Sequence, residues 1–237
     1  MEQLYRKNFS ELNIAFLPIR KNSKGIKNKN RKLLNKKPLF TYMLRALLES
    51  KNVHKVILAT DDDDLIENFN FSEFQYPEKL ELYRRSDENA GDFSSTESVI
   101  LEFITNSKLN HADNFILAQA TSPLLEPDDI DLFLNSYIKS KVDSMLSVVE
   151  FNGFIWSSQG NSLNYDWKNR PRRQDIINKS YQETGALYVS KVQDILNTKN
   201  RLNGRIGFYL LKEYQKLDID TIEDFIEAEN ILKNKES

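Results

Sequence analysis

The sequence contains no cysteine among its 237 residues. This absence excludes disulfides, thiolate nucleophiles and cysteine-ligated zinc, and it suits the reducing environment of the cytoplasm. Histidine is scarce as well, because the chain has only His54 and His111. Chemistry based on cysteine is therefore excluded, and little material is available for chemistry based on histidine.

Long apolar segments are also missing from the sequence. No stretch approaches the roughly 18 to 20 apolar residues of a membrane span, and the N-terminal MEQLYRKNFSEL lacks the apolar run of a signal peptide. The formal net charge of -2 argues against a general affinity for nucleic acid. We therefore expect a soluble, cytoplasmic protein that has neither a membrane nor a nucleic acid as its partner.

The residues that are present suffice to bury a core, since 40% are hydrophobic and 11% aromatic. Apolar runs rich in β-branched residues alternate with amphipathic segments, which predicts one layered α/β domain over residues 1–237 with a mostly parallel sheet. Strands are predicted at 13–19, 55–59, 80–83, 114–118, 144–151, 206–210 and 216–219. Helices are predicted at 39–49, 63–69, 95–106, 128–139 and 221–234, the last of which opens on a Thr-x-x-Asp capping box.

The regular alternation loosens between residues 152 and 205. This segment mixes polar residues with an apolar load that includes Trp156 and Trp167. A solvated loop should not expose so many aromatic side chains. We therefore expect residues 152–205 to form an insertion that packs on a second copy of the chain, and a local satellite core is the alternative.

The strongest chemical signal follows the first predicted strand. Residues 20–37 contain nine Lys or Arg and no acid. A loop at the carboxyl end of a parallel strand is where open α/β sheets bind ligands. Arg20, Lys24 and Lys29 offer positive charge to a triphosphate, and Gly25 lets the backbone turn and present N–H groups. The spacing is not that of a Walker loop, and the alternative is a solvated basic loop or a nucleic-acid patch.

Two carboxylates close the last predicted strand. Asp218 and Asp220 are two residues apart, and in extended chain such residues point to the same side. They are therefore candidates for binding one hard cation. The competing interpretation is that Asp220 or Thr221 caps the following helix.

Three weaker signals lie elsewhere in the chain. Gln119 follows a buried strand and carries both amide donors and an acceptor, although turn formation by Ser122 and Pro123 explains the same stretch. An arginine within residues 84–98 is a candidate for a phosphate contact, although Ser95 as a helix cap accounts for that composition equally well. Arg172 and Arg173 suit a carboxylate through a bidentate fork, or else belong to a solvated loop.

In order and spacing, these signals resemble the CMP-sialic acid synthetases, the acylneuraminate cytidylyltransferase family. Three family motifs occur in the family's order and cover nearly the whole chain. Their matching residues are Ala15, Arg20, Ser23, Lys24, Gly25, Lys29 and Asn30, then Leu117 to Leu125, then Asp218 to Thr221 with Asp224. The resemblance implies a Rossmann-like three-layer nucleotidyltransferase fold with a smaller dimerisation insertion, and a homodimer.

The resemblance also implies roles for individual residues. Expected contacts with CTP come from Arg20, Ser23, Lys29, Asn30, Arg85 and Thr96. Expected contacts with the sugar acid come from Gln119, Arg173 and Tyr188. Asp218 and Asp220 would bind Mg²⁺, and together with Arg20 and Lys29 they form the expected catalytic set.

The implied reaction is attack of the anomeric hydroxyl of a sialic-acid-type nonulosonic acid on the α-phosphorus of CTP, which yields the CMP-sugar and pyrophosphate. Positioning and charge neutralisation would carry such a reaction. The sequence departs from the family pattern at Ala120, Leu125 and Gln182. These departures leave open the same reaction on legionaminate, pseudaminate or KDO. A nucleotide-binding relative without turnover is the remaining alternative.

Overall fold

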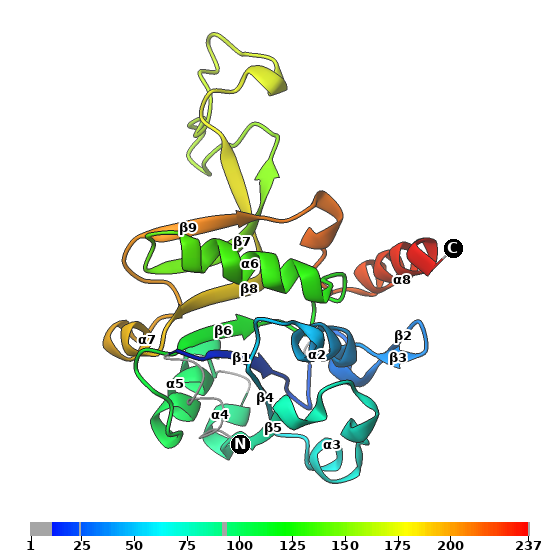
Figure 1. Cartoon of the computed structure of the whole chain (residues 1–237). Helices are drawn as coiled ribbons and strands as arrows, with labels where there is room; N and C mark the ends of the chain where they lie inside the picture. The colour runs from blue at the N-terminus through cyan, green and yellow to red at the C-terminus, as the bar shows by residue number, and fades with distance from the viewer. Residues whose placement is uncertain (1–10, 24, 92–93, 237) are drawn as a thin grey trace.

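A computed structural model describes residues 11–23, 25–91 and 94–236 of the chain (Figure 1). Its centre is a seven-stranded sheet with the order β5-β4-β1-β6-β8-β7-β9. The strands are β1 (Asn13–Pro18), β4 (Lys55–Thr60), β5 (Leu80–Arg84), β6 (Asn114–Ala118), β7 (Ser144–Phe151), β8 (Ser180–Lys191) and β9 (Ile206–Leu210). A separate hairpin pairs β2 (Leu33–Leu34) with β3 (Lys37–Pro38).

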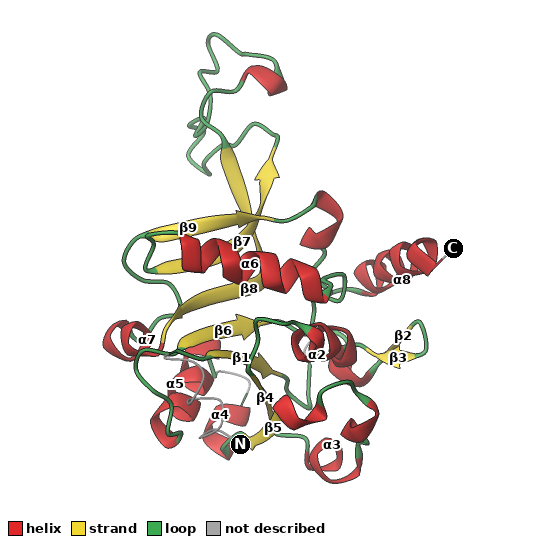
Figure 2. Cartoon of the chain, viewed as in Figure 1, coloured by secondary structure: helices red, strands yellow, loops and turns green. Residues whose placement is uncertain are grey.

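Helices cover both faces of the sheet (Figure 2). They are α2 (Phe40–Glu49), α3 (Asp63–Asn68), α4 (Asp87–Ala90), α5 (Thr96–Asn106), α6 (Pro127–Lys139), α7 (Val192–Thr198) and α8 (Ile222–Glu236). Short 3₁₀ turns are η1 (Lys29–Arg31), η2 (Phe71–Glu73), η3 (Pro77–Lys79), η4 (Arg173–Asp175) and η5 (Glu213–Lys216). The predicted three-layer α/β fold is confirmed.

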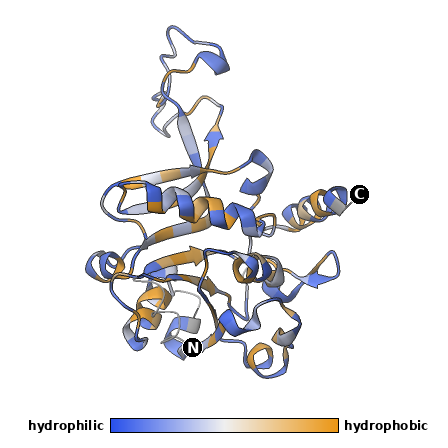
Figure 3. Cartoon of the chain, in the orientation of Figure 1, coloured by the Kyte–Doolittle hydropathy of each residue, from blue (hydrophilic) through white to orange (hydrophobic). Residues whose placement is uncertain are grey.

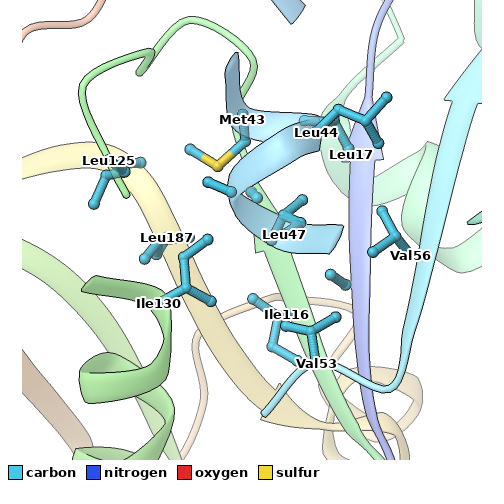
Figure 4. Packing of buried hydrophobic residues seen from close by; sticks show 14 of the residues in the cluster. Leu17, Met43, Leu44, Leu47, Val53, Val56, Ile116, Leu125, Ile130 and Leu187 are labelled. Carbon is cyan, nitrogen blue, oxygen red and sulfur yellow. The ribbon is translucent and has the colours of Figure 1, made fainter. Parts of the chain in front are cut away.

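Alternation along the strands divides the core between the two faces. In β1, Ala15 and Leu17 pack with α2 and α6 on one face, where Figure 4 shows Leu17 near Leu44 and Leu47. Ile14 and Phe16 pack with α5 and α7 on the other face. Hydrophobic residues accordingly concentrate in the sheet and in the helix faces beside it (Figure 3). A third cluster, which includes Phe225 and Leu232, packs α8 against the segment that follows β1.

The sheet is mixed rather than parallel throughout. Strand β8 is antiparallel to both β6 and β7, whereas the other pairings are parallel. Its reversed direction brings its first half, residues 180–185, beyond the carboxyl end of β6, because Leu187 pairs with Ala118. This half of β8 therefore lies at the edge of the sheet where parallel strands end and ligands bind.

Two other sequence-based predictions need correction. Residues 216–219 are not a strand, because no strand pairs with them; Ile219 instead donates its N–H to the carbonyl of Thr121 at 2.9 Å and buries its side chain under α8. The insertion is also narrower than 152–205, because β8 and α7 belong to the central layers. Only residues 152–179 project from the body, as an arm between β7 and β8 (Figure 1).

Candidate active site

A cleft of about 460 Å³ opens at the carboxyl ends of the parallel strands β1, β5 and β6. Eight residues predicted from the sequence for the site line it together, namely Arg20, Ser23, Lys29, Asn30, Arg85, Thr96, Gln119 and Asp220. Lys24, which the sequence also predicts to offer positive charge to the triphosphate, lies outside the described residues. The topology thus gathers side chains that are up to 200 positions apart in sequence.

The basic loop after β1 is tied to the rest of the site through its own residues. The Asn30 side chain is buried and donates to the carbonyl of Arg20 at 3.1 Å. Lys29 Nζ donates to the carbonyl of Ile219 at 2.5 Å and to Asp220 Oδ1 at 2.8 Å. A Cβ on Gly25 would lie 2.7 Å from the carbonyl oxygen of Asp220, so only glycine permits this close approach. The loop therefore contacts the segment that carries both predicted metal ligands.

A run of acids at residues 61–64 anchors the other side of the loop, and no local pattern in the sequence points to it. Asp61 accepts the backbone N–H of Lys21 at 2.8 Å. Asp62, whose side chain is 4% exposed, accepts from Arg31 at 3.2 Å and also caps α3. Asp64 accepts from the same guanidinium at 2.5 Å. The acid-free loop and this nearby acidic turn neutralise one another, which explains how so basic a segment folds back on the sheet.

Arg85 presents a guanidinium to the cleft from a buried position. Its side chain donates to the carbonyl of Asn89, while its Nε has no partner among the described residues. Burial lowers the pKa of Arg85. An orphaned donor on a buried cation is costly unless a ligand supplies the acceptor, and a phosphate oxygen suits it.

Glu102, in the middle of α5, organises the turn that carries Arg85. Its carboxylate accepts from the Tyr83 hydroxyl at 2.7 Å and from the Ser86 backbone at 3.1 Å, and it also accepts from the side chains of Ser86 and Asn89. Partial burial opposes ionisation, but these hydrogen bonds outweigh it and lower the pKa of Glu102 to about 2. The sequence offers no local signal for this residue.

We expect Glu102→Gln to destabilise the fold at neutral pH by about 1–3 kcal/mol, because a charged acceptor of several donors is lost. The folded pKa of Glu102 lies near 2, below the ordinary value of 4.5. Its contribution is therefore complete above pH 4.5 and declines as the pH falls toward 2. Thermal melts should show a difference in melting temperature between wild type and variant, and this difference should narrow as the pH falls through this range. Glu81→Gln, which removes one surface pair with Lys55, is the control and should change little; a gap independent of pH would contradict the assignment.

The carboxylates of Asp218 and Asp220 differ in environment. Burial raises the pKa of Asp218, a hydrogen bond with Thr121 opposes the rise, and the charge of Asp220 adds to it. Both residues are exposed to solvent, and Asp220 pairs with Lys29. The helix cap is Thr221, which exchanges hydrogen bonds with Asp224 at 2.7 and 3.2 Å in the predicted capping box. Neither aspartate side chain is used to cap α8, so capping does not explain the pair.

A bulge in β8 builds the corner next to Asp218. Four residues of β8, Thr184 to Leu187, stand opposite the single residue Ser147 of β7, and Ser147 and Thr184 exchange hydrogen bonds there. Gly185 adopts φ +75°, and a Cβ at this position would lie 3.7 Å from Asp218 Oδ2. The bulge also lets Glu183 accept a hydrogen bond from the Tyr188 hydroxyl. Tyr188 is thus placed at this corner rather than in the cleft lining.

Arg173 lies apart from these residues. It begins η4, which belongs to the arm between β7 and β8, and it does not line the cleft. On the same arm, the Tyr165 ring contacts Phe154 and Trp156, with ring centroids 4.4 and 5.9 Å apart respectively. These contacts form a small local core, yet Trp167 and Ile177 remain 56% and 93% exposed. Within one subunit the structure does not bring Arg173 to the other site residues.

At two serines the structure supports the local structural roles that the sequence offered as alternatives to ligand binding. Ser95 does cap α5, since it accepts the N–H of Ser98 at 3.0 Å, while the neighbouring Thr96 lines the cleft. Ser122 donates its N–H to the carbonyl of Gln119 and shapes the turn. Leu125, which stands where the family has an arginine, is buried in the core and does not reach the cleft. Gln182 is exposed on β8.

The sequence profile of the cytidylyltransferase family matches residues 14–236. The chain belongs to the cytidylyltransferase family. It is 34% identical over 224 residues to N-acylneuraminate cytidylyltransferase of Oncorhynchus mykiss, covering 91% of this chain and 49% of that protein. It is 35% identical to N-acylneuraminate cytidylyltransferase B of Danio rerio, covering 91% and 50%. The chain thus spans about half the length of these two relatives.

A relative of similar length is the pseudaminic acid cytidylyltransferase of Campylobacter jejuni, which is 26% identical, with 95% of this chain and 98% of that protein covered. Among solved structures, a CMP:2-keto-3-deoxy-manno-octonic acid synthetase complexed with CTP superposes with a TM-score of 0.67 at 14% identity, covering 95% and 100%. The 4-diphosphocytidyl-2C-methyl-D-erythritol synthase of Anaerococcus prevotii gives 0.67 at 12% identity, with the same coverage. These two structures show the fold of a cytidylyltransferase. None of the helices in the described part of the chain has the length and apolar character needed to cross a membrane.

Proposed function

We propose that the chain transfers CMP from CTP to the anomeric hydroxyl of a sialic-acid-type nonulosonic acid and releases pyrophosphate. The observation that carries the proposal is the meeting, in one cleft, of the basic loop, the Arg85 guanidinium, whose Nε has no partner among the described residues, and the carboxylate of Asp220. Family membership supports the nucleotidyl transfer, and the two N-acylneuraminate enzymes at 34% and 35% identity support the class of acceptor. A cytoplasmic location is part of the proposal, because a chain without cysteine suits that compartment.

In the proposed reaction the anomeric oxygen forms a bond to the α-phosphorus of CTP, and the bond from that phosphorus to the bridging oxygen of pyrophosphate breaks. The electron pair leaves with pyrophosphate, and the hydroxyl proton is lost. Arg20, Lys29 and Arg85 orient the triphosphate and neutralise the charge that develops on it. Ser23, Asn30 and Thr96 fix the nucleotide by hydrogen bonds, while Gln119 faces the acceptor sugar. No covalent enzyme intermediate is required.

Mg²⁺ fits the two aspartates. The pKa of Asp218 is raised by desolvation and by the charge of Asp220, so a divalent cation would relieve an unfavourable pair of charges. Carboxylate oxygens are the ligands that Mg²⁺ prefers, and it takes few from the protein because phosphates and water supply the rest. When bound there, the ion would neutralise phosphate charge.

A second acceptor class is favoured by one observation. The pseudaminic acid cytidylyltransferase of Campylobacter jejuni matches this chain over nearly its whole length. Pseudaminate is therefore the first alternative substrate, with legionaminate and KDO beside it. A relative without turnover is disfavoured, because Lys29 and Asp220 are both present and in contact at 2.8 Å.

The experiment is pyrophosphate release with CTP, Mg²⁺ and a panel of N-acetylneuraminate, pseudaminate, legionaminate and KDO. ATP, GTP and UTP serve as nucleotide controls. The proposal expects release that depends on both CTP and a nonulosonic acid and is greatest with N-acetylneuraminate. Turnover that is greatest with KDO or pseudaminate would move the assignment to that acceptor, and CTP binding without turnover would identify a silent relative.

We further propose a homodimer in which the arm of one subunit packs on its partner and brings Arg173 to the partner's sugar site. Arg173 lies away from the corner of its own subunit, and the arm exposes Trp167 and Ile177. The edge strand β9 adds a row of exposed apolar side chains, Ile206, Phe208 and Leu210, with exposures of 47%, 54% and 54%. An unpaired, apolar strand edge suits association with a second copy.

Light scattering is expected to report about twice 27.7 kDa. Trp167→Glu and Ile177→Asp on the arm should give monomers with reduced activity, because the charge is placed in the interface. Leu132→Glu is the matched control, since Leu132 is also 56% exposed but lies on α6. A fully active monomer would contradict this proposal. The aromatic side chains of the arm would then serve only as a local core.

A further inference from the structure

The cleft supplies cations for a triphosphate but no described arginine for the acceptor sugar. Its cationic side chains are Arg20, Lys29 and Arg85, and all three are proposed to face CTP. Arg173 lies on the arm. A sugar acid carries a carboxylate and carbonyl oxygens, and guanidinium groups are the donors best suited to them. A further arginine beside the cleft is therefore of interest.

Arg201 lies beside the cleft wall that α5 provides. It belongs to the connection between α7 and β9, and its side chain is only 20% exposed. Its Nε donates to Glu97 Oε1 at 2.6 Å, and Glu97 directly follows Thr96 of the cleft lining. Burial opposes ionisation of Glu97, but the hydrogen bond and charge of Arg201 lower its pKa overall. This ion pair holds the guanidinium against the α5 residue that follows Thr96 in the sequence.

The other contact of Arg201 joins it to the corner built by the β8 bulge. Its guanidinium carbon lies 4.9 Å from the centre of the Tyr188 ring, and Tyr188 donates to Glu183. Burial and the hydrogen bond to Glu183 raise the pKa of Tyr188, and the charge of Asp218 acts in the same direction while Arg201 opposes it. Tyr188 therefore interacts electrostatically with Arg201 on one side and with Asp218 on the other. Arg201 thus links this corner to the cleft wall.

The guanidinium retains donors for a ligand. Arginine has five N–H groups, and the described residues accept only the one on Nε. Stacking on Tyr188 and pairing with Glu97 restrict its rotamers, so little further entropy is lost when a ligand binds. A residue needed only to fasten α5 would not require this orientation toward Tyr188.

We propose that Arg201 contacts the acceptor sugar and helps to determine which sugar acid is used, by donating to one of its oxygen acceptors, the C1 carboxylate or an N-acyl carbonyl. This inference rests on the proposed function. Neither the basic loop nor the arm enters it, so it makes a claim about one subunit alone. The sequence did not single out Arg201, because nothing near it in the chain resembles a site.

The test is steady-state kinetics of Arg201→Met with saturating CTP and the best acceptor of the panel. We expect KM for the sugar acid to rise about tenfold or more, since a charge-assisted contact is lost, while KM for CTP changes less than about threefold. Arg201→Lys should recover part of the loss, because it restores the charge without the fork. Arg45→Met is the matched control, since Arg45 also pairs with a glutamate, at 2.8 Å, but between α2 and α6.

Glu97→Gln tests whether Arg201 contacts the sugar directly or only supports the cleft wall through its ion pair with Glu97. It weakens the ion pair and leaves the Arg201 donors in place, so the sugar KM should change less than about threefold. The proposal is wrong if Glu97→Gln raises KM for the sugar acid as much as Arg201→Met does. It is also wrong if Arg201→Met raises KM for CTP together with KM for the sugar acid, because Arg201 would then act only by supporting the α5 wall of the cleft. A wild type that uses no sugar acid overturns the proposed function, and the inference with it. Unchanged kinetics of Arg201→Met in an active enzyme overturn the inference alone.

Two analogues of the acceptor identify the oxygen that Arg201 contacts. With a C1 methyl ester of the sugar acid, the rise in KM caused by Arg201→Met should disappear if the carboxylate is the partner of Arg201. With an analogue that carries a hydroxyl in place of the N-acyl group, it should disappear if the acyl carbonyl is the partner. Persistence of the full penalty with both analogues would contradict a contact with either oxygen.

Discussion

Asp218→Asn is expected to lower kcat by about 10²- to 10³-fold or more while the melting temperature stays level or rises. Activity falls because the proposed metal loses a charged ligand. Stability does not fall, because burial raises the pKa of Asp218, which means that the folded protein disfavours this charge. Removing the charge at neutral pH therefore relieves a cost. Titration of activity with Mg²⁺, together with thermal melts, measures both effects.

Asp220→Asn should show the same loss of turnover with a nearly unchanged melting temperature, because its side chain is 73% exposed. Asp224→Ala is the control with the opposite pattern. It removes the capping box with Thr221, so it should lower stability by about 1 kcal/mol and affect turnover far less. If both site variants kept near-normal rates and only lost stability, the metal assignment would be wrong.

Lys29→Ala is expected to reduce kcat/KM for CTP by about 10²-fold or more. Its side chain is 12% exposed and donates to Asp220, so the substitution removes a pre-positioned cation from the cleft and also frees a proposed metal ligand. Lys36→Ala, in the same basic segment but exposed and outside the cleft lining, should change kcat/KM less than about threefold. Equal losses at the two positions would mean that only the general charge of the segment matters.

Varying the salt concentration distinguishes the two lysines further. The effect of an exposed charge is screened by salt, whereas a largely buried contact is screened much less. The defect of Lys29→Ala should therefore persist at high ionic strength. A defect that vanishes with added salt would assign Lys29 to long-range attraction of CTP rather than to direct contact.

Local patterns in the sequence are sufficient to predict part of the site. The buried run of β1 and the acid-free loop after it predict a phosphate-binding edge, because a parallel strand must end where its loop meets the ligand. The Asp-x-Asp spacing and the Thr-x-x-Asp capping box are local as well, and the structure distinguishes the residues of the pair from those of the cap.

Other features depend on contacts between distant residues, which no local pattern records. The acidic turn at residues 61–64 meets the basic loop only because β4 lies beside β1. Glu102 receives its donors from residues that lie 13 to 19 positions earlier in the sequence. The length of strand β8 and its place in the central sheet are not apparent from the sequence, because its first half is exposed and polar and its bulge interrupts the alternation. Residues 180–205 therefore resemble a continuation of the arm.

The most direct test of the central claim follows the anomeric oxygen through the reaction. A nonulosonic acid labelled with ¹⁸O at the anomeric position is incubated with CTP and Mg²⁺, and the products are analysed by mass spectrometry. The proposal predicts equal amounts of CMP-sugar and pyrophosphate, with the label in the CMP-sugar and none in pyrophosphate. Unlabelled CMP and pyrophosphate formed without a CMP-sugar, or label recovered in pyrophosphate, would contradict it.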